Sequence, residues 1–129
     1  MKDECLTFAR NTVVEAGLRY SLSWLFNHHR CPLLMLIRVV RMAFAVEKVP
    51  AFLALFHGSE HRIRQQPGCR HLALWQDADQ PNVYCTYSHW DDAAALDAYR
   101  QSALFGAVWP ATKRLFAAPP VAFSVHPVL

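Results

Sequence analysis

Four aromatic residues in the C-terminal half have the types and the spacing to build a pocket for a flat ligand. They are Trp90, Tyr99, Phe105 and Trp109. Flat aromatic molecules stack on such side chains, and a buried Trp or Tyr also needs a hydrogen-bond partner, which favours the edge of a pocket. Plain core packing is the alternative for all four, and it is the interpretation that we favour for Phe105. The sequence predicts that Trp90, Tyr99 and Trp109 converge on one cavity.

Arginines and histidines supply the candidate polar groups of such a pocket. Arg38 and Arg41 fall on opposite faces of a strand-like segment, and each is a candidate partner for an anion or a phenolate. His71 opens another strand-like segment and can face either side. His89 precedes Trp90 directly, so the two side chains point to opposite faces of their strand and do not act on the same pocket.

Histidine and cysteine spacing gives little support for a metal site. His57 and His61 are four residues apart on a predicted helix, but they lie near its polar face and have no third ligand. The four cysteines form no CxxC pair, and the pair of histidines at 28–29 has no partner pair at ligand spacing. We predict no metal, and reduced thiols in a cytoplasmic protein.

Composition limits the other partners. The chain has 129 residues, of which 53% are hydrophobic and 18% are charged, and this is the composition of one globular domain. The net charge is +3 and the basic residues form no cluster, which argues against nucleic acid. No apolar run approaches the roughly 20 residues of a membrane-spanning helix. The predicted partners therefore include neither nucleic acid nor a membrane.

The periodicity of residues 35–129 predicts the elements that would position these side chains. Strand-like, helical, strand-like, strand-like, helical, helical and strand-like segments follow in turn, at 36–44, 49–66, 71–76, 83–90, 93–101, 103–116 and 121–128. Asp91 or Asp92 caps the second helix. This order is the βαββαβ of an α+β, ferredoxin-like fold, with an antiparallel sheet and helices on one face. The other sheet face is apolar, and pairing with a second copy in a homodimer would cover it.

Residues 1–34 differ from the rest of the chain. An amphipathic helix is predicted over 11–26, and Pro32 ends it. We predict that 1–34 are an N-terminal extension, either helical or poorly ordered, and that the functional domain spans 35–129.

The stretch YSHWDDAAALDAYRQSALF, from Tyr87 to Phe105, also carries a family resemblance. Trp90 ends a strand, Asp91-Asp92 caps a helix, Ala95-Leu96 and Tyr99 follow, and Ser102 to Phe105 completes the pattern. The PGC turn at 67–69, followed by a strand, fits as well. The segment resembles the strand-to-helix motif of the antibiotic biosynthesis monooxygenase family, over about residues 35–129. The resemblance implies a dimeric α+β barrel with a pocket between sheet and helices in each protomer.

Family members differ in chemistry. Several oxidise polycyclic phenols or quinols without metal or flavin, some degrade haem, and others act on small signalling molecules. The haem-degrading branch has a His where Trp109 stands and a first-strand Asn where Val40 stands, so these departures argue against haem, and no cofactor is predicted. The His that is common in the helical motif is Tyr99 here.

The resemblance and the residues together predict a cofactor-independent monooxygenase for a small aromatic, quinol-like or phenol-like substrate. Trp90 and Tyr99 are its predicted catalytic residues, which orient the substrate and share the phenolic proton. The predicted substrate-binding residues are Trp109, Phe105, Arg41 and His71. The alternative is a non-catalytic or differently catalytic dimeric barrel that binds an aromatic or isoprenoid metabolite.

Overall fold

The computed structural model describes residues 34–128 of the chain. Four strands, a short 3-10 turn and three helices follow in the order β1 (Leu36–Ala43), η1 (Val46–Lys48), α3 (Val49–Arg64), β2 (Cys69–Gln76), β3 (Val83–Trp90), α4 (Ala93–Arg100), α5 (Ala103–Lys113) and β4 (Val121–Val125). The N-terminal extension was predicted over residues 1–34, and its residues 1–33 lie outside the described part.

The strands form one antiparallel sheet in the order β2-β3-β1-β4. The central strand β1 pairs with both β3 and β4, so that Val39 lies opposite Tyr87 on one side and Phe123 on the other. This is the strand order of the ferredoxin-like fold, and the predicted α+β class is confirmed.

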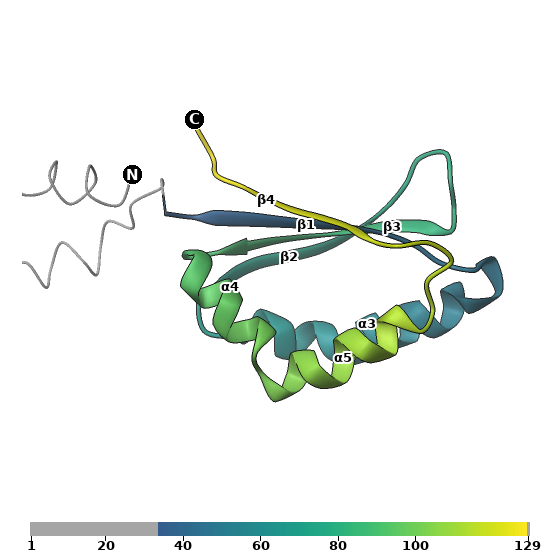
Figure 1. Cartoon of the computed structure of the whole chain (residues 1–129), viewed down its shortest axis with the longest axis horizontal. Helices are drawn as coiled ribbons and strands as arrows, with labels where there is room; N and C mark the ends of the chain where they lie inside the picture. Colours follow the sequence, from purple (N-terminus) through teal and green to yellow (C-terminus); the bar gives the residue numbers. More distant parts are fainter. Residues whose placement is uncertain (1–33, 129) are drawn as a thin grey trace, which may run out of the picture.

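All three described helices lie against one face of the sheet (Figure 1). The longest of them, α3, begins with a proline in its first turn and buries Phe52, Phe56, Ser59 and Ile63 at spacings of four, three and four residues. Because these positions form one stripe, the helix covers the sheet with that stripe and leaves its histidines exposed.

The turn after α3 needs a glycine. Gly68 has a φ of +81°, and a Cβ atom there would lie 2.5 Å from the Cβ of Ala95. A β-bulge follows between Cys69 and His71, and Arg70 in this bulge donates two hydrogen bonds of 2.7 Å to Asp91. Gly68 thus allows the start of β2 to approach the start of α4 closely.

The two predicted cap candidates have separate roles. Asp92 is the N-cap of α4, because its Oδ1 accepts a hydrogen bond of 2.8 Å from the backbone N–H of Ala95. Asp91 instead pairs with Arg70. Ser102 caps α5 in the same way by accepting from the N–H of Phe105. These caps fix where the helices start relative to Trp90.

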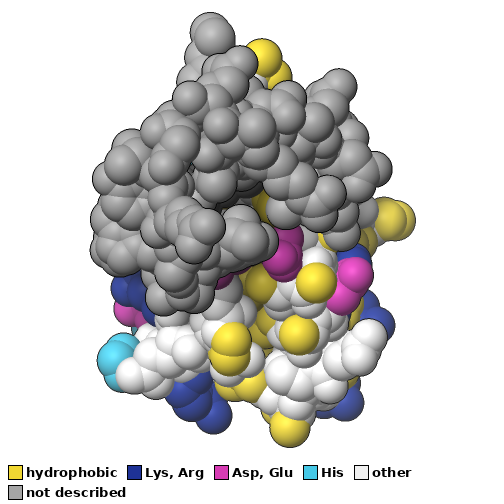
Figure 2. All heavy atoms as spheres, turned by 90° about the vertical axis from the view of Figure 1, so that its left-hand side faces the viewer, with side chains coloured by type: hydrophobic (Ala, Val, Ile, Leu, Met, Phe, Trp, Pro, Cys, Tyr) yellow, Lys and Arg dark blue, Asp and Glu magenta, His cyan; other side chains and the backbone are white. Residues whose placement is uncertain are grey.

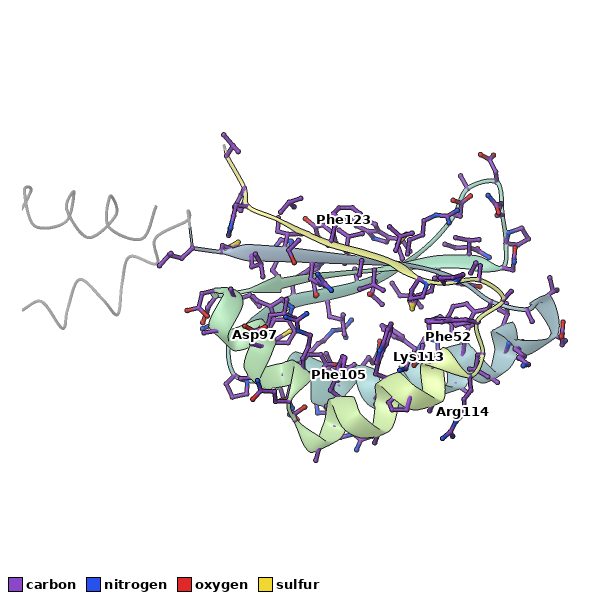
Figure 3. The ribbon with its side chains drawn as sticks, viewed as in Figure 1. Phe52, Asp97, Phe105, Lys113, Arg114 and Phe123 are labelled. Atoms are coloured by element: carbon purple, nitrogen blue, oxygen red, sulfur yellow. The ribbon has the colours of Figure 1, made fainter. Side chains whose placement is uncertain are left out.

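The core fills the space between the helices and the sheet. Phe44 and Phe52 stack with ring centroids 4.0 Å apart, and Tyr84 packs against both. A second, smaller cluster joins Leu36, Trp90 and Leu96. Figure 3 shows Phe52 and Phe105 between helices and sheet, with Phe123 on the opposite side of the sheet.

The sheet face away from the described helices is called the open face here. Its residues come from all four strands and are largely apolar or aromatic: Ile37, Val39, Arg41, Ala43, His71, Ala73, Trp75, Cys85, Tyr87, His89, Val121, Phe123 and Val125. Trp75 is 52% exposed and Phe123 is 48% exposed. No element among residues 34–128 covers this face (Figure 1).

The predicted element boundaries differ from the structure mainly at strand ends. The first strand ends at Ala43, and Phe44 forms a single bridge to Phe116. The last strand ends at Val125 rather than at residue 128, because Pro127 cannot donate to the ladder. There the His126 side chain lies within hydrogen-bond distance of the Met35 carbonyl oxygen, at 2.8 Å.

Candidate functional site

A cavity of about 140 Å³ lies between the helix-covered face of the sheet and helices α3, α4 and α5. Its walls are largely apolar, with a few polar groups. The lining residues that matter below are Arg38, Val40, Thr86, Ser88, Trp90, Tyr99, Arg100, Phe105, Trp109 and Thr112. The cavity thus brings together the four aromatic residues that the sequence analysis selected.

Trp90 forms the deepest aromatic wall. It is the last residue of β3, its side chain is only 1% exposed, and its Nε1–H donates a hydrogen bond of 3.0 Å to the Oγ of Ser88. Its ring stacks on Tyr99 with centroids 5.0 Å apart and planes 18° apart. The need for a hydrogen-bond partner favoured the edge of a pocket, but Leu36 and Leu96 enclose the indole.

The aromatic wall continues along the helices. Tyr99 meets the edge of Phe105 at 5.3 Å, and Phe105 stacks on Trp109 at 5.9 Å. These contacts join residues of β3, α4 and α5 into one unbroken row of rings from Trp90 to Trp109. Phe105 therefore both packs in the interior and lines the cavity.

Tyr99 keeps its proton over a wide pH range. Burial, with a smaller contribution from Cys69, raises the pKa of the Tyr99 phenol to about 12. Among residues 34–128, no partner accepts or donates a hydrogen bond at this hydroxyl. At neutral pH Tyr99 is therefore a neutral phenol, able to donate a hydrogen bond but not to act as a strong base.

Two arginines give the cavity a positive pole. Arg38 extends from the helix-covered face of β1, and its Nη1 donates a hydrogen bond of 3.1 Å to the Oγ of Ser124 on β4. Arg100 lies at the end of α4, beside Tyr99, and pairs with Asp97. Burial, and then the positive charge of Arg100, lower the pKa of Arg38. Two cationic groups thus line one apolar cavity close enough to repel each other.

Arg41 and His71, predicted to bind substrate, lie outside this cavity. Both are on the open face of the sheet. Arg41 pairs with Asp77 at 3.7 Å. The placement follows from strand alternation, because residue 41 has the opposite parity to residues 38 and 40.

His71 belongs to an aromatic row on the open face, in which its ring lies 5.2 Å from His89 and 5.9 Å from Tyr87. The Nε2 of His89 is buried and has no hydrogen-bond partner among the described residues. Burial, followed by the nearby His71, lowers the pKa of His89. The prediction that His89 and Trp90 face opposite sides of the sheet is confirmed.

Several polar residues of the cavity were missed by the sequence analysis. Ser88 and Thr86 share the face of Trp90, and strand alternation back from Trp90 would have identified both. Ser88 accepts the hydrogen bond from the indole, so it fixes the orientation of that ring. Arg100 carries no comparable signal, because its approach to the cavity depends on how α4 packs.

The described part of the chain shows two further absences. No group of three or more His, Cys, Asp or Glu side chains is arranged to hold a metal ion within residues 34–128. Within the same range, no helix is long and apolar enough to cross a membrane.

The fold and the cavity together define a small α+β protein with a ferredoxin-like sheet and an aromatic-lined internal site. Residues 35–109 match the family model for antibiotic biosynthesis monooxygenases, and the chain belongs to that family. Among proteins of curated function, none matches the chain.

Solved structures share the fold. A conserved protein from Methanosarcina mazei Go1 superposes with a TM-score of 0.71 at 19% identity, over 74% of this chain and 94% of that one. A structure named as an antibiotic biosynthesis monooxygenase gives a TM-score of 0.69 at 21% identity, over 73% and 99% of the two chains. Rv0793 from Mycobacterium tuberculosis gives a TM-score of 0.68 at 20% identity, over 73% and 95%.

Proposed function

We propose that the protein is a cofactor-independent monooxygenase that oxidises a small phenol or quinol inside the helix-covered cavity. The row of rings from Trp90 to Trp109, which walls that cavity, carries the proposal. A flat, electron-rich ring is the ligand that such walls hold best. Family membership and the name of one structural relative support oxygen chemistry.

The volume of the cavity supports a single-ring substrate. The cavity measures about 140 Å³, and a cavity of about 150 Å³ in another protein holds one benzene molecule. A larger ring system would have to extend out past the arginines or move the helices. A methyl-substituted phenol is therefore a better test substrate than a polycyclic one.

The proposed reaction consumes one O₂ per substrate. The ring carbon opposite the phenol oxygen exchanges its hydrogen for one atom of O₂, the second atom leaves as water, and the phenol becomes a quinone. The substrate supplies all four electrons. In this scheme Trp90 holds the ring by stacking, and neutral Tyr99 donates a hydrogen bond to the substrate or to a reduced oxygen species. The buried walls keep water from the intermediate.

The haem-degrading chemistry of other family members does not fit this cavity. No histidine of the described residues lines it, and Trp109 occupies a wall position. A volume near that of one benzene ring is also far too small for a tetrapyrrole. The residues on the cavity wall therefore favour a reaction without haem.

A specific observation also supports the alternative, a barrel that binds an aromatic metabolite without oxidising it. Among residues 34–128, no carboxylate or imidazole lines the cavity, and Tyr99 is protonated at neutral pH. No lining side chain is thus a ready base for the phenolic proton. This site would bind a neutral aromatic molecule well and leave it unchanged.

Homodimer formation through the open face is part of the proposal. The face presents Trp75, Phe123 and Val121 to solvent in the described chain, and the Arg41 charge on it is already paired. A twofold copy of the same face would bury these groups against one another, as two packed sheets do.

Cys69 and Cys85 are free thiols, which a reducing cytoplasm would preserve.

Oxygen isotope incorporation tests the function directly. Purified protein is incubated with 2-methylphenol under ¹⁸O₂, and the product is analysed by mass spectrometry. The monooxygenase predicts methylbenzoquinone that carries one ¹⁸O atom, formed well above the rate without protein and greatly reduced in Trp90→Phe. Binding of 2-methylphenol without any labelled quinone would favour the binding barrel.

A further inference from the structure

Arg38 has the features of an anion receptor. It lines the apolar cavity, it is only partly exposed, and its hydrogen bond to the Ser124 hydroxyl leaves its charge uncompensated. No carboxylate pairs with it among residues 34–128, whereas Arg41, Arg64, Arg70 and Arg100 each pair with one. A guanidinium that is held at a cavity wall without a counter-ion favours the binding of a negatively charged oxygen.

Arg100 adds a second positive charge to the same wall. It lines the cavity next to Tyr99, and its pairing with Asp97 neutralises only part of the local charge. The proximity of the two guanidinium groups is unfavourable by itself, and an anion placed between them would relieve their repulsion.

We propose that Arg38 and Arg100 form an anion subsite that binds the phenolic substrate as its phenolate. This inference rests on the proposed function and names the ionisation state that its site selects. The aromatic ring lies against Trp90 and Tyr99, and the phenolate oxygen points to the two arginines.

The anion subsite explains how the bound phenol can lose its proton without a neighbouring base. Because the part of the chain that the structure describes places no carboxylate or imidazole on the cavity wall, no side chain in that part is assigned as the base. Two cations lower the pKa of the bound phenol instead, and its proton leaves to solvent as the ligand binds. A phenolate transfers an electron to O₂ more readily than its phenol does, so the same contact that binds the substrate also activates it.

The test measures the ionisation of a bound probe. 4-Nitrophenol is a single ring whose phenolate absorbs at longer wavelength than its phenol, and 4-nitroanisole is a close analogue that cannot ionise. We expect the wild-type protein to bind the phenolate about tenfold more tightly than the phenol, which lowers the pKa of the bound probe by about one unit. 4-Nitroanisole should bind more weakly than the phenolate at every pH.

Matched variants connect the effect to the two arginines. Arg38→Gln should remove most of the preference, and Arg100→Gln should reduce it less, because Arg100 already pairs with Asp97. Arg114→Gln is the control, since it removes the same charge from an exposed position at the end of α5 (Figure 3). Circular dichroism checks that each variant is folded, and Arg38→Lys tests whether any cation at this position suffices.

The outcomes separate the two proposals. A phenolate preference that is lost in Arg38→Gln and kept in Arg114→Gln supports the anion subsite. Two results would overturn the anion subsite: equal binding of the phenolate and 4-nitroanisole, or a phenolate preference that is unchanged in folded Arg38→Gln protein. Neither result would contradict the proposal that the cavity binds an aromatic ring. Failure of the wild-type protein to bind either probe overturns the proposed function itself.

Discussion

The two faces of this sheet are built from the same four strands and from similar residue types, yet they differ in what surrounds them. On the helix-covered face, Trp90 and Tyr99 stack in an enclosed interior around a cavity. On the open face, Trp75 and Tyr87 stack with centroids 4.5 Å apart, and no described helix covers them. A stacked aromatic pair is thus not a site by itself, because enclosure and a nearby charge are what distinguish the first pair.

The arginines of β1 show the same contrast. Arg38 and Arg41 are three residues apart and point to opposite faces. Arg41 has Asp77 as its counter-ion, whereas the partner of Arg38 within residues 34–128 is the Ser124 hydroxyl. One arginine is electrostatically satisfied on the open face, and the other faces a cavity.

Side chains at the end of the molecule where α4 begins are mixed in character. Figure 2 shows hydrophobic, basic and acidic side chains interspersed on the part of this surface that the described residues form. The contrast between the two faces therefore concerns the sheet itself.

Phe123→Asp should disrupt the proposed dimer. The substitution places one carboxylate from each copy in an apolar interface, and an unpaired buried charge costs about 3–5 kcal/mol, which weakens association at least about a hundredfold. Size-exclusion chromatography with light scattering at micromolar concentration should report twice the chain mass for the wild-type protein and one chain mass for the variant.

The control for this experiment is Val46→Asp. Val46 is also an exposed apolar residue, but it lies in the turn before α3 rather than on the open face. It should leave the dimer intact. A wild-type protein that is a monomer under these conditions would refute the assignment of the open face.

Tyr99 should make stability fall in strongly alkaline solution. Its folded-state pKa is raised from 10.0 to about 12. Between these values the unfolded chain loses the proton while the folded chain keeps it, so the free energy of unfolding decreases as pH rises from 10 towards 12. The expected loss is on the order of 2–3 kcal/mol, and Tyr99→Phe should remove this part of the pH dependence.

Ultraviolet absorbance of tyrosinate provides the direct measurement. The wild-type spectrum minus the Tyr99→Phe spectrum should titrate near pH 12 in the folded protein, and near pH 10 in strong denaturant. The same residue is then its own control. A folded-state midpoint at 10 would mean that the Tyr99 hydroxyl is in contact with water.

Trp90→Phe should affect both stability and binding. Because the indole is buried and donates to Ser88, the smaller ring loses a hydrogen bond and leaves space, at a cost of about 1–3 kcal/mol. Binding of 4-nitrophenol should weaken about tenfold as the cavity wall recedes. Because Trp90 is buried, its role in the core and its role in the cavity wall are both lost in this variant.

Trp75→Phe is the matched change on the open face. It should leave 4-nitrophenol binding unchanged, since Trp75 does not line the cavity. If Trp90→Phe loses stability but binds 4-nitrophenol normally, Trp90 only packs in the core and is not part of the binding site.

The sequence predicts the sheet and its two faces because strand alternation is a local property. Assigning Arg38 and Arg41 to opposite faces needed only their parity, and the third strand was predicted with its true limits at Val83 and Trp90. The pocket membership of Tyr99 and Trp109 was also accessible, since capped helices place their rings at known turns.

Other features of the site depend on packing between distant segments. The cavity lies on the helix-covered side of the sheet. Local sequence did not show which side that would be, so His71 and Arg41 were predicted to bind substrate although they lie on the open face. Arg100 approaches Arg38 only because α4 packs beside Trp90. The choice between Asp91 and Asp92 as the cap depended on Arg70, which a β-bulge brings to Asp91. Such contacts have no signature in local sequence.

Removal of residues 1–34 should have the smallest effect. The shortened chain begins at Met35, whose carbonyl oxygen keeps its contact with His126, and β1 begins directly after it. If the open face is covered by a second copy, the shortened protein should remain a dimer, with a free energy of unfolding within about 0.5 kcal/mol of the full chain. Thermal melting and light scattering on both chains measure these quantities. A shortened chain that loses its cooperative melt would show that residues 1–34 belong to the core, and one that forms larger assemblies would show that they cover the open face. The deletion therefore decides whether the exposed apolar sheet is satisfied by another protomer or by the chain's own N-terminal segment.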